Sequence, residues 1–190
     1  RLVKDDVPSK VINQYLNLNV NEKPILYKQD IDEIKNQKFL KSEVESFDIN
    51  EIQISDENRN SRLSFDSNEN ILIKIDFNSS KFIRDFRTVV MINLSNGQNI
   101  LSTTQAEDSR MLNFNHLEKG KYTFECMLPN SIFGENDYYI SIRLIDQDNY
   151  YLFLENIFKI NINFKFFSNE IYLTDHDAPI KLKCKWNAYD

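Results

Sequence analysis

The feature of this sequence that most restricts its fold is an alternation of apolar and polar residues that runs, almost without interruption, from Phe47 to Phe164. In the segment Ile71–Phe77, for example, Lys74 and Asp76 stand between isoleucines and a phenylalanine. A period of two is typical of β-strands, because successive side chains of a strand point to opposite faces of its sheet. The alternation therefore predicts a mainly β structure.

Strand and turn signals recur at regular intervals along this stretch. Turn residues lie at Ser95–Gln98 and Glu118–Lys121, and a break covers Pro129–Asp137. Seven to nine strands at this spacing predict an all-β fold, an immunoglobulin-like antiparallel β-sandwich of two facing sheets. The segments are Phe47–Asp56 with a phase slip near Asn50, Ile71–Phe77, Phe86–Ser95 (apolar on both faces, as in an inner strand), Asn99–Gln105, Arg110–Leu117, Lys121–Leu128, Asp137–Asp146 and Tyr150–Phe164.

The regions that flank the alternating stretch have other patterns. Residues 7–19 place apolar side chains at helical spacing and predict one short amphipathic helix. Residues 20–46 are highly charged with weak periodicity, which predicts a linker with at most one or two helical turns. We therefore divide the chain into a helix and linker at 1–46 and a sandwich domain at 47–190. In the tail, lysines alternate with apolar residues over Ile180–Trp186, which predicts a last edge strand.

Composition and motifs exclude several classes of function. The 190 residues carry 23 Lys and Arg against 29 Asp and Glu, and a net charge of −6 argues against nucleic-acid binding. Two histidines and two cysteines are too few and too scattered for a metal site or a disulfide framework, and Cys126 is expected to be a buried, inert thiol. Neither a phosphate-binding loop nor a serine-nucleophile motif is present. We assign no catalytic residue and no cofactor.

The polar face of the predicted strands is the remaining candidate for function. Sugars present apolar C–H faces that stack on aromatic rings, and hydroxyl groups that bind planar polar side chains. Side chains of these types share the non-core phase of two predicted strands or follow a turn. For each of them a structural role, in closing the core or in pairing with a neighbouring acid, is the alternative. The candidate ligand-binding residues are Arg87, Met91, Asn93, Tyr139, Ser141, Arg143 and Tyr151.

The order of six segments adds a resemblance to these patterns. The segments are VPSKVINQYL, ENILIKIDFNSS, FRTVVMINLSNGQNILSTTQ, LEKGKYTFECML, DYYISIRLID and IKLKCKW. In this order they resemble the C-terminal carbohydrate-binding domain of polysaccharide-exporting ABC transporter ATP-binding subunits of the Wzt type, which handle O-antigen. The resemblance covers about residues 47–186, together with the helix at 7–16. The family often has more glycines at its turns, including one that opens the last strand, whereas this tail has none there.

The resemblance implies a cytoplasmic, non-catalytic module at the inner face of the plasma membrane. Such a module recognises a lipid-linked polysaccharide and couples its recognition to export. An upstream ATPase domain and a membrane permease are the implied partners, and the family tends to form homodimers with an exchanged C-terminal strand. Two other interpretations stay open: an adhesive or protein-binding β-sandwich, and a sandwich enzyme that acts on glycans through an acidic pair.

Overall fold

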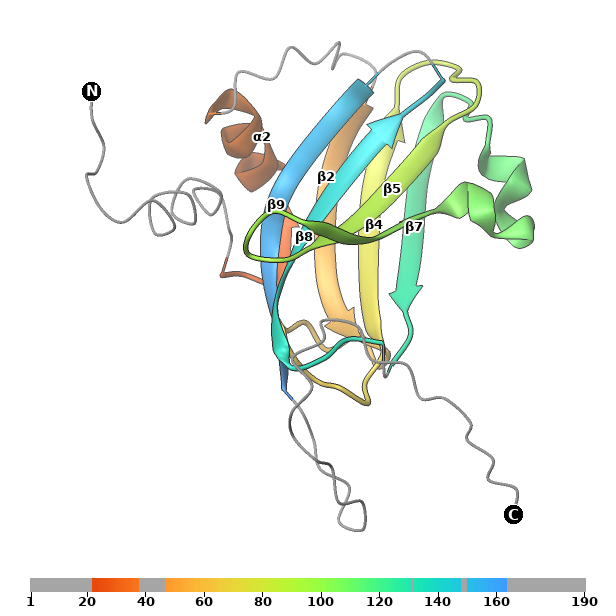
Figure 1. Ribbon diagram of the computed structural model, residues 1–190. Helices are drawn as coiled ribbons and strands as arrows, with labels where there is room; N and C mark the ends of the chain where they lie inside the picture. The colour runs from red at the N-terminus through yellow and green to blue at the C-terminus, as the bar shows by residue number, and fades with distance from the viewer. Residues whose placement is uncertain (1–21, 38–46, 131, 148–149, 164–190) are drawn as a thin grey trace, which may run out of the picture.

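The computed structural model describes residues 22–37, 47–130, 132–147 and 150–163, which form two β-sheets packed face to face (Figure 1). One sheet has the strand order β1-β2-β4-β7, and the other has the order β3-β9-β8-β5-β6. The elements are β1 (Ile25–Tyr27), α2 (Lys28–Gln37), β2 (Phe47–Asp56), β3 (Ser64–Asp66), β4 (Ile71–Ser79), β5 (Arg87–Asn93), β6 (Asn99–Thr104), the 3₁₀ helices η2 (Gln105–Glu107) and η3 (Ser109–Phe114), β7 (Gly120–Leu128), β8 (Asn136–Ile145) and β9 (Tyr150–Asn163).

The sandwich predicted from the alternation is confirmed, with one difference in strand direction. β5 lies between β8 and β6, as expected for an inner strand, and the phase slip near Asn50 is a bulge between Ile49 and Glu51. The short strand β3, however, pairs with β9 in parallel. Alternation reports which face a side chain occupies, but it does not encode the neighbour or the direction of a strand.

The core lies between the two sheets and is dense in aromatic rings at one end. The inward residues of β4 and β8 are buried as the period of two predicts. Ring centroids of Phe47 and Phe86 are 5.2 Å apart, and those of Phe77 and Phe124 are 5.3 Å apart. Each buried Phe stabilises the fold by about 1.5–3 kcal/mol, so these rings contribute strongly to the stability of the sandwich.

Part of the stretch expected to be a linker is packed structure. β1 pairs with β2, and α2 follows β1 directly in the chain. Leu26, Ile31 and Ile34 are buried in the core. Three apolar side chains among many charges give a weak periodic signal, so tertiary packing rather than pattern stabilises this segment. The helix predicted at 7–19 and the strand predicted at 180–186 lie outside the described residues.

The segment Arg110–Leu117 also differs from the expected strands. Most of it belongs to η3, which begins after Asp108. The Asp108 side chain accepts a hydrogen bond of 2.9 Å from the backbone N–H of Arg110, and a carboxylate at this position favours a helical turn over an extended chain. Within the described ranges, no helix is long and apolar enough to span a membrane.

Candidate ligand-binding surfaces

Five of the seven predicted site residues lie together on the outer face of the five-stranded sheet. The register of β5 and β8 places Met91 opposite Ser141 and Asn93 opposite Tyr139, and Arg143 follows on the same face of β8. We call these five residues the outer-face cluster. Arg87 lies at the start of β5, where its side chain is exposed, and Tyr151 lies elsewhere.

The polar atoms at the centre of the outer-face cluster are bound to one another. The Asn93 side-chain amide donates hydrogen bonds of 2.9 Å both to the Ser141 hydroxyl and to the Asn156 side-chain oxygen Oδ1. The Asn99 side-chain amide donates to the Asn93 side-chain oxygen Oδ1 at 3.0 Å. Ser141 accepts from the backbone N–H of Asn156 at 2.8 Å. The four residues form one network, which we call the Asn–Ser network, in which each side chain has a partner.

This network fixes an irregular point in β9. The pairing of β8 with β9 shifts between Ile140 and Ile142, and Asn156 has a positive φ of 49° there. Asn adopts this left-handed backbone more readily than most residues do. Ser141, which binds Asn156, is fully buried, Tyr139 is only 4 % exposed and Asn93 is only 6 % exposed. The prediction that Asn93, Tyr139 and Ser141 face solvent is therefore wrong. Their role in binding stays a prediction.

The accessible part of the outer-face cluster is smaller. Arg143 is half-buried, and its guanidinium lies 4.4 Å from the centroid of the Phe153 ring, a cation–π contact. In the part of the chain that the structure describes, its Nε has no hydrogen-bond partner. Met91 is half-buried as well. Arg87, Met91 and Arg143 are thus the predicted residues that a ligand on this face would reach.

Tyr151 lies apart from this cluster, at one end of the sandwich. Its ring packs edge-on against Phe47 at 5.0 Å, and its hydroxyl donates to the Asp146 carboxylate. Tyr151 lines a polar pocket of about 490 Å³, which we call the end pocket. The pocket is formed by Lys81, Phe82, Ile83, Arg84, Asp85, Asp146, Gln147 and Tyr151.

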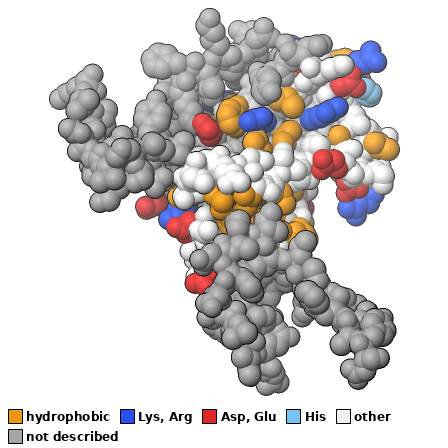
Figure 2. All heavy atoms as spheres, in the orientation of Figure 1, with side chains coloured by type: hydrophobic (Ala, Val, Ile, Leu, Met, Phe, Trp, Pro, Cys, Tyr) orange, Lys and Arg blue, Asp and Glu red, His pale blue; other side chains and the backbone are white. Residues whose placement is uncertain are grey.

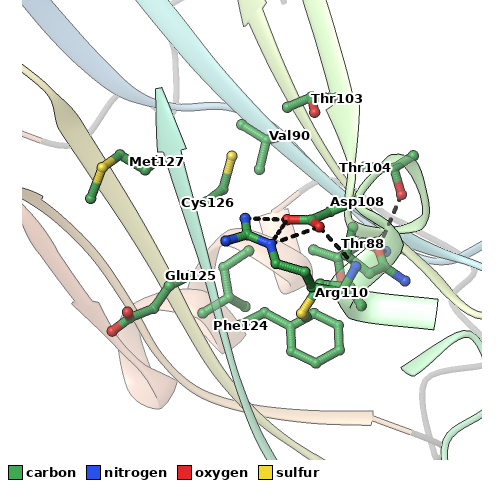
Figure 3. A pocket seen from close by; sticks show the side chains of 13 residues that line it. Thr88, Val90, Thr103, Thr104, Asp108, Arg110, Phe124, Glu125, Cys126 and Met127 are labelled. Atoms are coloured by element: carbon green, nitrogen blue, oxygen red, sulfur yellow. Dashed lines mark hydrogen bonds and ion pairs between the residues drawn. The ribbon is translucent and has the colours of Figure 1, made fainter. Parts of the chain in front are cut away.

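A second hollow, which the sequence did not reveal, opens between the layers where the edge strands β6 and β7 leave the sandwich unclosed (Figure 3). We call it the edge cleft. Its volume is about 270 Å³, near the lower limit of about 300 Å³ for small-molecule pockets. Its apolar walls are Ile75, Val90, Met111, Phe124, Cys126 and Met127, and its polar residues are Thr88, Thr103, Thr104, Gln105, Asp108, Arg110 and Glu125.

An ion pair lies in the polar lining of the edge cleft. The Arg110 guanidinium meets the Asp108 carboxylate at 2.6 Å and 3.0 Å, as the dashed lines of Figure 3 show. The side-chain and backbone hydrogen bonds from Arg110 lower the pKa of Asp108 to about 2, so this carboxylate stays charged at neutral pH. In the same lining, burial raises the pKa of the Cys126 thiol to about 11, as expected for an inert cysteine.

One buried polar atom of the edge cleft is unsatisfied. Thr88 is 5 % exposed, and among the described residues its hydroxyl has no hydrogen-bond partner. The backbone N–H of Thr88 donates to the side-chain oxygen of Gln105 at 2.7 Å. The side-chain N–H of Gln105 in turn donates to the backbone carbonyl of Phe86 at 2.8 Å. Gln105 thus continues the edge of β5 beyond the end of β6. A buried hydroxyl without a partner is unusual and marks a place where a ligand atom can bind.

Comparisons with known proteins place this fold in a family. The family model described as the Wzt C-terminal domain matches residues 42–171. The chain belongs to the Wzt C-terminal domain family. A solved crystal structure of the C-terminal domain of wzt superposes with a TM-score of 0.56 at 14 % identity, and the match covers 76 % of this chain and 84 % of that chain. No curated protein matches the sequence.

Membership of the Wzt C-terminal domain family confirms the resemblance found in the sequence. Domains of this family serve ABC transporters that export polysaccharides, and they are not catalytic. In this Wzt C-terminal domain the edge cleft combines apolar walls, one unpaired hydroxyl and a fixed ion pair. These groups suit reversible binding of a small unit with C–H faces and hydroxyls. The only local sequence signal for the cleft was the spacing Asp108-x-Arg110, which favours a turn in which the two side chains form an ion pair.

Proposed function

We propose that this domain binds the polysaccharide that its transporter exports and holds one sugar unit in the edge cleft. The observation that carries the proposal is the buried, unpartnered hydroxyl of Thr88 in a cleft of about 270 Å³ that has both apolar and polar walls. A ligand hydroxyl that pairs with it removes the cost of an unsatisfied buried group. Family membership supports the class of ligand.

The lining of the cleft supports this choice of ligand. Phe124 and Met111 offer apolar surface to the C–H face of a sugar ring. The Asp108 carboxylate accepts hydrogen bonds from hydroxyl groups, and the guanidinium protons of Arg110 that do not bind Asp108 donate to ring or hydroxyl oxygens. Such contacts are individually weak, so a polymer gains from being held at two sites of a dimer.

The wider setting follows the family. We infer that the ligand is a lipid-linked, O-antigen-like polysaccharide and that the partners are an ATPase domain, a membrane permease and a second copy of the chain. The module would act on the cytoplasmic side, at the inner face of the plasma membrane, without a cofactor. The accessible residues Arg87, Met91 and Arg143 of the outer sheet face are a second candidate contact for the same polymer. An adhesive or protein-binding role is the alternative function.

Calorimetric titration of the 190-residue chain with the surface polysaccharide of its source organism tests the proposal. We expect measurable binding, and we expect Thr88→Val to weaken it about tenfold, because one hydrogen bond to a buried group contributes about 1.4 kcal/mol. Ser102→Ala is the matched control, since it removes an exposed hydroxyl from the neighbouring edge strand. Absence of binding by the native chain would reject the function, whereas unchanged binding by Thr88→Val and by Arg110→Ala would reject only the edge cleft.

A further inference from the structure

Two segments near the upper end of the sandwich carry an excess of positive charge. We call residues 80–87 and 109–121 the basic corner. They hold six Lys or Arg and two Asp or Glu, although the whole chain has a net charge of −6. The remaining residues therefore carry 17 Lys or Arg against 27 Asp or Glu. This separation of charge indicates a surface for an anionic partner.

Backbone hydrogen bonds join the two segments into one surface. The N–H of Ile83 donates to the carbonyl of Leu117 at 2.8 Å, and the N–H of Leu117 donates back to Ile83 at 2.8 Å. The Phe86 N–H donates to the Asn115 carbonyl at 2.8 Å. The rings of Phe82 and His116 stack with their centroids 6.4 Å apart. The basic corner is thus fixed where the loop from β4 to β5 meets the start of β7 (Figure 1).

The charged side chains of the basic corner are exposed, and most of them form no ion pair with a described carboxylate, although the Lys81 ammonium lies 5.6 Å from the centroid of the Tyr151 ring. Arg84 contacts Asp85 at 3.5 Å, and Arg110 is bound by Asp108. In the described part of the chain, the other four cations form no ion pair with a carboxylate. All six side chains are exposed: Lys81, Arg84, Arg87, Arg110, Lys119 and Lys121.

Exposed apolar side chains stand among these cations. Phe82 and Leu112 are each 55 % exposed, and Phe114 is 38 % exposed; they are three of the five exposed large apolar side chains of the described residues. Lys81, Phe82 and Arg84 line the end pocket of about 490 Å³, together with the carboxylates of Asp85 and Asp146. Figure 2 shows Lys and Arg side chains next to hydrophobic ones over the upper part of this face. Protruding apolar groups among cations match the headgroup region of a membrane, where negative charge overlies hydrocarbon.

We propose that the basic corner docks this domain on an anionic membrane surface. Lys81 and Arg84 bind lipid phosphates at the mouth of the end pocket, while Phe82 and Leu112 enter the headgroup layer. An acidic protein would satisfy the cations, but its surface would offer no hydrocarbon layer for Phe82 and Leu112 to enter. The docking goes beyond polysaccharide binding and does not depend on it.

Flotation of the 190-residue chain with lipid vesicles tests this proposal. We expect the chain to bind vesicles of phosphatidylcholine with phosphatidylglycerol, to bind phosphatidylcholine alone far less, and to be released by high salt. Each Lys or Arg near such a surface strengthens binding about fivefold, so Lys81→Ala combined with Arg84→Ala should weaken binding about 25-fold. Phe82→Ser should weaken it further without a change in salt dependence.

A matched double variant distinguishes an effect of the position of the cations from an effect of the net charge of the chain. Lys28→Ala with Lys159→Ala removes the same charge from exposed positions outside the basic corner, and it should leave vesicle binding within about twofold. If Lys81→Ala with Arg84→Ala fails to fold by circular dichroism, Lys119→Ala with Lys121→Ala takes its place. Equal losses in corner and control variants, equal binding to both kinds of vesicle, or binding to an acidic protein or polysaccharide but not to anionic vesicles would overturn the proposal.

Discussion

The outer-face cluster and the edge cleft show opposite ways of treating buried polar groups. On the outer face, Asn93, Ser141 and Asn156 satisfy one another through hydrogen bonds of 2.8–2.9 Å. In the edge cleft, the hydroxyl of Thr88 is equally buried but has no partner among the described residues. A satisfied network rigidifies a sheet, whereas an unsatisfied group destabilises the empty protein and favours a bound ligand. The type of a residue alone therefore does not show whether its buried polar group has a structural role or binds a ligand.

The largest effect that tests this comparison is expected from Asn93→Ala. The substitution removes the hydrogen bonds that Asn93 makes with the buried Ser141 and Asn156 side chains and with Asn99, at the irregular point of β9. We expect the free energy of unfolding to fall by about 3 kcal/mol. Urea titration of the variant and the native chain measures it.

Ser102→Ala provides the control for the Asn93 substitution. Ser102 is exposed on β6, opposite Met91, and its loss should change the free energy of unfolding by less than about 0.5 kcal/mol. If Asn93→Ala were as stable as this control but lost polysaccharide binding, the Asn–Ser network would be a ligand site, and the contrast with the edge cleft would disappear.

The second effect concerns binding. Cys126→Phe adds a ring to the wall of the edge cleft and fills much of its volume of about 270 Å³. We expect polysaccharide affinity to fall at least about tenfold, with a cost in stability of about 1–3 kcal/mol from overpacking. Calorimetry measures the affinity, with Arg143→Ala on the outer face as the partner experiment. A larger loss in Arg143→Ala than in Cys126→Phe would move the site to the outer face.

The alternation of the sequence predicted much of the fold because each strand faces a core on one side. It located the bulge after Ile49 and the inner position of β5. It could not predict α2, whose two buried isoleucines, Ile31 and Ile34, are surrounded by charges. Nor could it predict that Asn156 would cover Ser141, since the irregular pairing of β9 depends on a contact between separate strands.

The edge cleft was beyond prediction for a related reason. Thr88, Arg110 and Phe124 come from β5, η3 and β7, and they meet only because β6 and β7 are the neighbouring edges of two different sheets. Strand phase assigns each residue to a face, but the order of strands decides which faces and edges come together. The predicted set therefore contained residues of only one strand that lines the cleft, β5, and it contained none of the residues of the cleft itself.

A smaller effect on stability should come from Thr88→Val. Replacing the unpartnered hydroxyl with a methyl group removes the cost of burying it, so the free energy of unfolding should rise by about 1 kcal/mol. Stability and polysaccharide affinity would then change in opposite directions. Thermal unfolding of the ligand-free chain measures the gain. A loss of stability of similar size would mean that the hydroxyl is already satisfied, which would remove the main argument for the edge cleft.

The smallest effect is expected at the ion pair of the cleft. The hydrogen bonds from Arg110 lower the pKa of Asp108 to about 2 from the usual 3.8, so folding favours the ionised carboxylate. The stabilising effect is therefore complete above about pH 4 and is lost as the pH falls toward 2. Because the pair is exposed, the change in stability is small and is screened by salt. Titration of the Asp108 carboxyl carbon by NMR measures the midpoint directly, with Arg110→Ala as the comparison, in which the midpoint should return toward 3.8. A midpoint near 3.8 in the native chain would show that Arg110 does not hold Asp108 in solution, and that the ion pair of the cleft is not preformed.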